Sequence, residues 1–238
     1  MTKKNKIMIY ADGSNFEEMI SLNKNNKIRG FTTNPSLMKK EGVKDYEKFA
    51  KKILENIKFK PVSFEVFSDD LDKMEMEALK ISKWGKNVFV KIPITNSKGK
   101  STAKLIDKLN SLGINCNITA IFTVTQVKHL LSKVKFKSKN IFSIFAGRIA
   151  DTGKDPKNII IDTIKLTKNI KEIKILWASV REPFNLVQAE NYGCHIITVT
   201  PDIIRKINKF NYSLKQYSID TVKQFYIDAK ESKFKLIK

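Results

Sequence analysis

Short, continuously apolar runs alternate with longer amphipathic stretches along most of this 238-residue chain. The runs are rich in β-branched and aromatic residues, which is typical of strands buried on both faces in a parallel sheet. We expect strands at residues 7–10, 28–31, 62–67, 88–94, 114–122, 141–145, 173–178 and 195–199. Between them, apolar residues at helical spacing predict helices over residues 45–57, 70–84, 101–112, 125–134, 156–169 and 183–191.

Strands that alternate with helices in this way predict an α/β protein built on a single (β/α)8 barrel of the TIM type. An open doubly wound sheet is the alternative, but no GxGxxG motif follows the first predicted strand. No Pro/Gly/Ser-rich linker or change in composition divides the chain. We therefore expect a barrel catalytic domain over residues 1–211. Residues 212–238 form a C-terminal extension of the same domain, with one extra helix over 219–229.

The charge of the chain is strongly positive, with 45 Lys+Arg against 24 Asp+Glu and a formal net charge of +21. Such a surplus could supply many phosphate contacts to a nucleic acid. Only four of the basic residues are arginines, however, and the lysines are spread along nearly the whole chain. Lysine, isoleucine and asparagine are all abundant and all have A/T-rich codons, so biased base composition explains the surplus. We favour that explanation and expect no nucleic-acid partner.

Several other classes of protein are excluded by composition. No apolar run approaches the roughly 20 residues that a membrane-spanning helix needs, and the apolar stretch at residues 7–11 is too short for a signal peptide. Cys116 and Cys194 have no CxxC spacing, which argues against a disulfide scaffold or a zinc ribbon. The spacing of His129 and His195 suits no metal site. We expect a cytoplasmic protein with neither a metal ion nor a membrane contact.

Polar side chains occur on or just beyond nearly every predicted strand. In a (β/α)8 barrel the active site lies at the C-terminal ends of the strands, and each strand contributes part of it. The candidates are Asp12, Thr32, Thr33, Asn34, Glu65, Ser68, Lys91, Asn117, Thr119, Ser143, Arg148, Ser179 and Arg181. The pattern therefore predicts a polar pocket at this end of the barrel.

Lys91 interrupts the most apolar segment of the chain, the predicted strand at residues 88–94. Burying an ammonium group without a partner is unfavourable, and the usual response is a lowered pKa and a neutral amine. A neutral amine in a dry pocket is a nucleophile toward carbonyl groups, as Schiff-base formation requires. The alternative is a lysine that reaches solvent from the strand end or pairs with a carboxylate. Asp12 and Glu65 are candidate partners in either case.

Six short segments carry a more specific signal, because they occur together and in a fixed order. They are GFTTNPS at 30–36, VKIP at 90–93, NIT at 117–119, FAGRI at 145–149, ASVR at 178–181 and GCHIITVTPD at 193–202. Together, and across residues 7–205, these segments resemble the transaldolase family. The resemblance implies a class I aldolase-type (β/α)8 barrel that uses neither a metal nor an organic cofactor.

The resemblance also implies catalytic roles for four of the candidates. Lys91 would form a Schiff base with the C2 carbonyl of a ketose phosphate. Asp12 would take the proton from the C4 hydroxyl as the C3–C4 bond breaks. Glu65 and Thr119 would handle the water molecule that is released and taken up as the Schiff base forms and is hydrolysed. Carboxylates in these roles need pKa values near neutral pH, which burial and a neighbouring carboxylate provide.

Six further candidates would bind the substrate. The dihydroxyacetone hydroxyls would be held by Asn34, Asn117 and Ser143, and the substrate phosphate by Arg148, Ser179 and Arg181. Arginine binds a phosphate bidentately, and this chain uses lysine almost everywhere else for positive charge. Each arginine alone could equally form a salt bridge at a strand end, but the two together favour a phosphate site.

The expected activity is transfer of a dihydroxyacetone unit from sedoheptulose 7-phosphate or fructose 6-phosphate to an aldose phosphate. Such a reaction serves the pentose phosphate pathway or the synthesis of an unusual surface sugar, and the sequence does not distinguish the two. One alternative is a lyase similar to the fructose-6-phosphate aldolases, which release free dihydroxyacetone. Those relatives carry Gln where this chain has Glu65 and Tyr where it has Phe145, so both positions favour transfer. A second alternative is a basic, non-catalytic barrel that binds nucleic acid.

The length of the chain is similar to that of a short subgroup of the family. Members of that subgroup form rings of five or ten subunits through the C-terminal helix, which implies a homo-oligomer here, through residues 219–229. The expected partners are therefore sugar phosphates and further copies of the same chain.

Overall fold

The computed structural model describes residues 7–13 and 15–233, and the chain divides into two compact units, residues 1–204 and 205–238. The last residues of the expected C-terminal extension, 234–238, lie outside the described residues.

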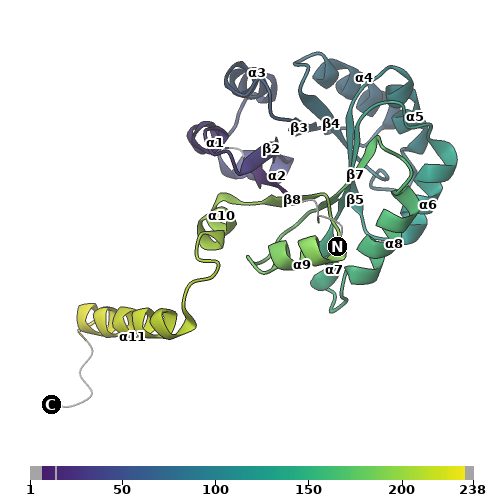
Figure 1. Cartoon of the computed structure of the whole chain (residues 1–238). Helices are drawn as coiled ribbons and strands as arrows, with labels where there is room; N and C mark the ends of the chain where they lie inside the picture. The colour runs from purple at the N-terminus through teal and green to yellow at the C-terminus, as the bar shows by residue number, and fades with distance from the viewer. Residues whose placement is uncertain (1–6, 14, 234–238) are drawn as a thin grey trace. The chain divides into compact units, whose positions relative to one another are not determined.

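Eight strands of the described part form a closed barrel in which every neighbouring pair is parallel. In chain order they are β1 (Met8–Asp12), β2 (Ile28–Thr32), β3 (Val62–Glu65), β4 (Val88–Pro93), β5 (Cys116–Ile121), β6 (Asn140–Ile144), β7 (Ile173–Trp177) and β8 (Ile196–Val199). The barrel closes because β8 pairs with β1, and helices of the first unit such as those at residues 71–82, 103–111 and 157–167 lie outside the ring of strands (Figure 1). Each strand lies within a predicted run or overlaps one, so the (β/α)8 prediction is confirmed.

Ten helices belong wholly or partly to the first unit, as far as the structure describes it. They are α1 (Phe16–Asn23), α2 (Pro35–Lys40), α3 (Tyr46–Asn56), α4 (Leu71–Ser82), α5 (Ala103–Ser111), α6 (Val124–Lys133), α7 (Ala146–Ala150), α8 (Lys157–Thr167), α9 (Asn185–Tyr192) and α10 (Pro201–Ile207). The six predicted helices are all present. The sequence pattern does not predict α1, α2, α7 or α10, which have eight, six, five and seven residues.

The lower part of the barrel interior is filled by apolar side chains. Tyr10, Phe89, Ile141, Leu176, Ala178 and Ile196 form one buried cluster, against which Met8 and Phe145 pack. The ring of Tyr10 leaves room only for glycine at position 30 on the neighbouring strand, because a Cβ there would lie 2.5 Å from the ring. The polar residues near the strand ends therefore rest on a close-packed apolar floor.

The second unit contains helix α11 (Leu214–Glu231), which is longer in both directions than the helix predicted over residues 219–229. Ser213 caps it, since its hydroxyl accepts a hydrogen bond from the backbone N–H of Gln216. None of the described residues of α11 is buried. Among the helices of the described residues, none is long and apolar enough to cross a membrane.

Candidate active site

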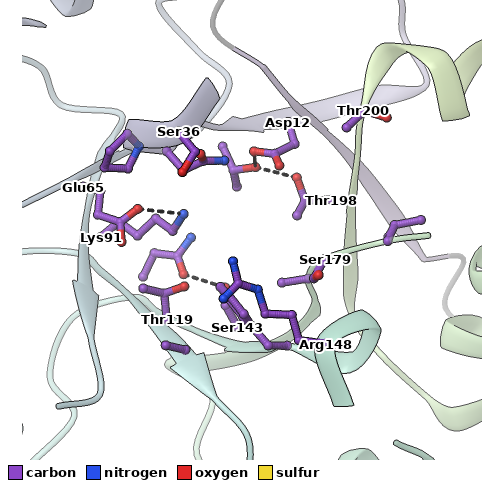
Figure 2. Close-up of a pocket in the computed structure, with 18 of the residues that line it drawn as sticks. Asp12, Ser36, Glu65, Lys91, Thr119, Ser143, Arg148, Ser179, Thr198 and Thr200 are labelled. Atoms are coloured by element: carbon purple, nitrogen blue, oxygen red, sulfur yellow. Dashed lines mark hydrogen bonds and ion pairs between the residues drawn. The ribbon is translucent and has the colours of Figure 1, made fainter. Parts of the chain in front are cut away.

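A pocket of about 500 Å³ opens at the C-terminal ends of the barrel strands (Figure 2). All of the predicted catalytic and binding residues line it, although they come from seven different strand ends: Asp12, Asn34, Glu65, Lys91, Asn117, Thr119, Ser143, Arg148, Ser179 and Arg181. In Figure 2, Lys91 and Glu65 lie on one side of the pocket, with Ser179 on the opposite side. The fold thus brings together residues that are spread over 170 positions of sequence.

Lys91 lies near the end of β4 and is only 8% exposed. Its Nζ is 3.1 Å from Glu65 Oε2 and donates a hydrogen bond to the carbonyl oxygen of Thr33 at 3.0 Å. The strand register fixes this arrangement, since Glu65 on β3 and Asn117 on β5 are the lateral neighbours of Lys91. The structure shows a buried amine paired with a carboxylate, which is one form of the alternative stated above, and not a side chain that reaches solvent. A buried ammonium needs such partners to offset the loss of water.

Asp12 ends β1 and faces the same cluster of charges. Its Oδ1 accepts a hydrogen bond of 2.8 Å from the hydroxyl of Thr32. Burial raises the pKa of Asp12 above its ordinary value of 3.8, while the positive charge of Lys91 and the Thr32 hydrogen bond act in the opposite direction. The negative charge of Glu65 adds to the increase. A carboxyl group with a raised pKa is suited to taking up and returning a proton near neutral pH.

Three uncharged residues, Asn117, Thr119 and Ser143, line the same pocket. The Asn117 amide group donates to Ser63 Oγ at 3.0 Å, and its carbonyl oxygen accepts from the hydroxyl of Ser143 at 2.7 Å. Thr119 differs, because its buried Oγ1 has no hydrogen-bond partner among the described residues. A buried hydroxyl normally has a partner, so a ligand or a water molecule in the pocket is the natural one.

Asn34 also has a structural role, as the N-terminal cap of helix α2. Its side-chain oxygen accepts a hydrogen bond of 3.0 Å from the backbone N–H of Leu37 and so caps helix α2. Pro35 occupies the first helical position, where its missing N–H is not needed. The Asn34 side chain is therefore held at the pocket wall, with its amide N–H groups left for a substrate.

The two predicted phosphate-binding arginines lie at the mouth of the pocket. Arg148 lies on α7, with its guanidinium 5.6 Å from the centre of the Phe145 ring. Arg181 follows β7 and forms a two-point ion pair with Asp151, in which Nε lies 3.1 Å from Oδ1 and Nη2 contacts Oδ2. The pair is half-exposed, so it contributes little to stability. One edge of the Arg181 guanidinium is thus engaged, and its outer N–H groups remain for an anion.

The turn that carries Ser179 is strained and tightly packed. Ser179 has a φ of +63°, a conformation that residues other than glycine rarely adopt. A Cβ at Gly147 would lie 1.5 Å from the Ser179 carbonyl oxygen, so only glycine fits there. The close approach of α7 to this turn fixes Ser179 beside Arg148.

The structure also shows pocket residues that the sequence analysis does not single out, namely Ser36, Thr198 and Thr200. For Thr198 a signal exists, because it is a hydroxyl residue inside the otherwise apolar β8 segment. Ser68, one of the strand-end candidates, does not line the main pocket. Its hydroxyl instead donates to Glu77 at 2.6 Å and closes the turn after β3.

Cys116, Cys194 and His195 do not line the pocket, and their contacts indicate a role in packing. Burial raises the pKa of both Cys116 and Cys194 to about 12, which keeps the thiols protonated and unreactive. His195 Nδ1 accepts a hydrogen bond of 2.9 Å from the backbone N–H of Ile175, so the ring supports the β7–β8 connection. Within the described residues, no group of three or more His, Cys, Asp or Glu side chains could hold a metal ion.

The raised pKa of Asp12 predicts that this residue reduces stability at neutral pH. Above its folded-state pKa the partly buried carboxylate is charged and costs stability, whereas below the unfolded-state pKa both states are protonated and the cost disappears. We expect Asp12→Asn to raise the melting temperature at pH 7, with an advantage that shrinks toward pH 3. Asp69 is the matched control, because hydrogen bonds from Ser97 lower its pKa and Asp69→Asn should not stabilise. An Asp12→Asn protein less stable than the wild type at pH 7 would contradict this prediction.

Comparisons with known proteins agree with this geometry. A "Probable transaldolase" from Thermoanaerobacter sp. (strain X514) is 36% identical over 201 residues, which covers 84% of this chain and 88% of that protein. Another, from Methanococcus vannielii, is 33% identical over 212 residues and covers 89% and 93%. The crystal structure of a protein assigned to the dihydrodipicolinate synthase family, from Coccidioides immitis, shares the fold. It has a TM-score of 0.60 at 8% identity and covers 83% of this chain and 68% of that one.

A family model described as Transaldolase/Fructose-6-phosphate aldolase matches residues 9–236, nearly the whole chain. The chain therefore belongs to the transaldolase/fructose-6-phosphate aldolase family.

Proposed function

We propose that this protein is a transaldolase of the pentose phosphate pathway. It transfers a dihydroxyacetone unit from sedoheptulose 7-phosphate or fructose 6-phosphate to an aldose phosphate, through a Schiff base on Lys91. One observation carries the proposal: the buried Lys91 amine lies 3.1 Å from the Glu65 carboxylate, in a pocket that also contains Arg148 and Arg181. An amine for a carbonyl group and arginines for a phosphate thus share one cavity of substrate size.

The first step joins the lysine to the substrate. Glu65 takes a proton from the Lys91 ammonium group, and the neutral amine attacks the C2 carbonyl to give a carbinolamine. Glu65 then returns the proton to the departing hydroxyl group, which leaves as water. The unpartnered hydroxyl of Thr119 is available to hold that water molecule. This chemistry uses side chains alone, with no metal or organic cofactor.

The second step breaks the C3–C4 bond. Asp12 takes the proton of the C4 hydroxyl, the C4 oxygen becomes the carbonyl of the departing aldose, and the bonding electrons move toward the protonated imine. The three-carbon enamine that remains then attacks the aldehyde of the acceptor, and Asp12 returns its proton to the new hydroxyl group. Hydrolysis of the second Schiff base releases the product and restores Lys91.

Binding positions the sugar for these steps. Asn117 and Ser143 already orient each other through their hydrogen bond of 2.7 Å, so with Asn34 they present fixed polar groups to the dihydroxyacetone hydroxyls. Arg148, Ser179 and the outer N–H groups of Arg181 hold the phosphate at the opposite end.

Phe145 favours transfer over simple cleavage. It lines the pocket and packs against Phe122, with ring centres 5.7 Å apart. A phenylalanine carries no proton for the enamine, so the bound three-carbon unit waits for an acceptor aldehyde. The nucleic-acid-binding alternative gives no reason for an ion pair inside the barrel, and we assign no nucleic-acid partner.

We also propose that residues 1–211 perform the catalysis and that residues 212–238 serve assembly. Helix α11 exposes a row of large apolar side chains, including Val222 at 61% and Phe225 at 66%, and a second copy of the chain would cover them. We propose a cytoplasmic location because the two buried cysteines are free thiols.

The assay that tests the proposed function compares fructose 6-phosphate with and without erythrose 4-phosphate. We expect sedoheptulose 7-phosphate when the acceptor is present and almost no free dihydroxyacetone when it is absent, with both activities lost in Lys91→Met. Phe145→Tyr adds a proton donor beside the enamine and should increase release of dihydroxyacetone on the order of a hundredfold. Phe122→Tyr is the matched control, because its ring packs on Phe145 but does not line the pocket. Rapid release by the wild type without acceptor would instead support the aldolase.

Assembly is tested by mass photometry of the full chain at nanomolar to micromolar concentrations. We expect the wild type to be larger than a monomer and the Val222→Glu/Phe225→Glu protein to be monomeric, because the two glutamates place charge in the apolar contact. Lys223→Glu is the matched control, since it changes charge on the same helix without removing apolar surface. A monomeric wild type would contradict the assembly proposal and leave the catalytic one unaffected.

A further inference from the structure

Two buried threonine hydroxyls connect Asp12 to the last strand of the barrel. Thr32 Oγ1 lies 2.8 Å from Asp12 Oδ1 and 2.5 Å from Thr198 Oγ1. Thr32 is 3% exposed and Thr198 is 6% exposed, so water does not compete strongly for these bonds. The three side chains form a short chain of hydrogen bonds at the top of the barrel, which Figure 2 shows beside the labelled Asp12 and Thr198.

The closed barrel is what brings these residues together. β2 and β8 are the two neighbours of β1, with Asp12 opposite Thr32 and Tyr10 opposite Thr198. Inward side chains from β2 and β8 can therefore meet beside the inward side chain that ends β1. No local sequence spacing predicts a contact between residues 32 and 198.

The hydroxyl protons can be placed from the chemistry of the groups. An ionised carboxylate only accepts hydrogen bonds, so the Thr32 proton points to Asp12 Oδ1. Thr32 Oγ1 then has only lone pairs to offer to Thr198, so the Thr198 hydroxyl must be the donor in the second bond. The chain runs in one direction, from Thr198 to Thr32 to Asp12.

This direction distinguishes the two oxygens of Asp12. If Oδ1 carried a proton and donated it to Thr32, both hydroxyl groups would have to turn and the chain would reverse. Protonation of Oδ2 leaves both hydrogen bonds intact, and none of the described residues donates a hydrogen bond to Oδ2. Oδ2 is therefore the oxygen that can take up a proton without disturbing this chain.

We propose that Thr198 is a positioning residue that acts through Thr32 to hold Asp12 Oδ1 as a hydrogen-bond acceptor and reserve Oδ2 for proton exchange with the substrate. The proposal rests on the role of Asp12 as the base in the proposed function. Valine has nearly the same shape as threonine but lacks the hydroxyl, so shape alone does not require threonine at this position. A buried hydroxyl is unfavourable unless it has a hydrogen-bond partner, and Thr32 is the partner of Thr198.

The groups around Asp12 determine whether loss of a hydroxyl raises or lowers its pKa. Lys91 on β4 is the cation that stabilises the ionised form, Glu65 on β3 is the anion that opposes it, and the neighbouring strands β2 and β8 contribute the two uncharged threonines. Burial has the largest effect and raises the pKa, whereas the hydrogen bond from Thr32 lowers it. Removal of either hydroxyl should therefore raise the pKa of Asp12 further.

The test follows the titration of Asp12 itself, by carbon-13 NMR of protein labelled at the aspartate Cγ. The Asp12 signal is assigned by its loss in Asp12→Asn. The variants are Thr198→Val, which removes the hydroxyl, Thr198→Ser, which keeps it, Thr32→Val, and the Thr32→Val/Thr198→Val double variant. The matched control is Thr163→Val, which removes a buried hydroxyl that donates to Ile159 on α8, away from the pocket. Melting temperatures show which variants remain folded.

We expect Thr32→Val to raise the Asp12 midpoint by on the order of one pKa unit. Thr198→Val should raise it by a smaller amount, the double variant by no more than Thr32→Val alone, and Thr198→Ser and Thr163→Val should leave it unchanged. A Thr198→Val midpoint equal to that of the wild type would overturn the proposal. So would a Thr198→Ser shift as large as that of Thr198→Val, or a double-variant shift equal to the sum of the single shifts.

The titration needs no substrate, so it gives a result even if the protein transfers no dihydroxyacetone. Single-turnover cleavage of fructose 6-phosphate supplies the link to the reaction, because its acidic limb should move to higher pH by the same amount in Thr198→Val. A shifted Asp12 titration with an unmoved acidic limb would overturn the role of Asp12 as the base, and with it the proposed function, but would leave the hydroxyl chain in place.

Discussion

The contact between Lys91 and Glu65 is the constraint on which the site depends. Two opposite charges inside a barrel are acceptable only when they lie close together and their other hydrogen-bonding positions are filled. The register of β3 and β4 makes the two residues lateral neighbours, and the Thr33 carbonyl oxygen at the end of β2 provides a second acceptor for the amine. A shift of β3 against β4 would separate the two charges, and a shift of β2 would remove the second acceptor of the amine.

The barrel interior contains an apolar cluster and, at the C-terminal ends of the strands, a polar pocket. The apolar cluster around Tyr10 fills the lower part and fixes the strands, so that polar side chains at their ends have little freedom. Above it, Asp12 is partly buried, and its desolvation raises its pKa, which reduces stability but suits a group that exchanges protons. Ser179 also costs stability, because its backbone is strained, and the close packing of Gly147 holds that turn in place beside the pocket.

The sequence predicts the fold well because strands buried on both faces leave an unmistakable apolar pattern. It also predicts which residues line the pocket, since polar residues at strand ends must meet at one end of a barrel. The helices α2, α7 and α10 are not predicted because their five to seven residues complete at most about two turns and show no period. Helix α1 is as long as α9, which is predicted, and its omission has no such explanation. The Thr32–Thr198 contact and the Arg181–Asp151 ion pair escape prediction for another reason, since both join strand ends or loops whose approach depends on the closed barrel. For Lys91 the sequence shows neither its burial nor its partner, and only the structure places the buried amine 3.1 Å from Glu65.

The central claim is that one lysine among many forms a covalent bond with a sugar. Reduction with borohydride in the presence of fructose 6-phosphate, followed by peptide mapping, tests that claim most directly, because reduction converts a Schiff base into a stable amine. The account predicts a single adduct on the peptide that contains Lys91, with none in the Lys91→Met protein. An adduct on another lysine, or no adduct at all under turnover conditions, would contradict it.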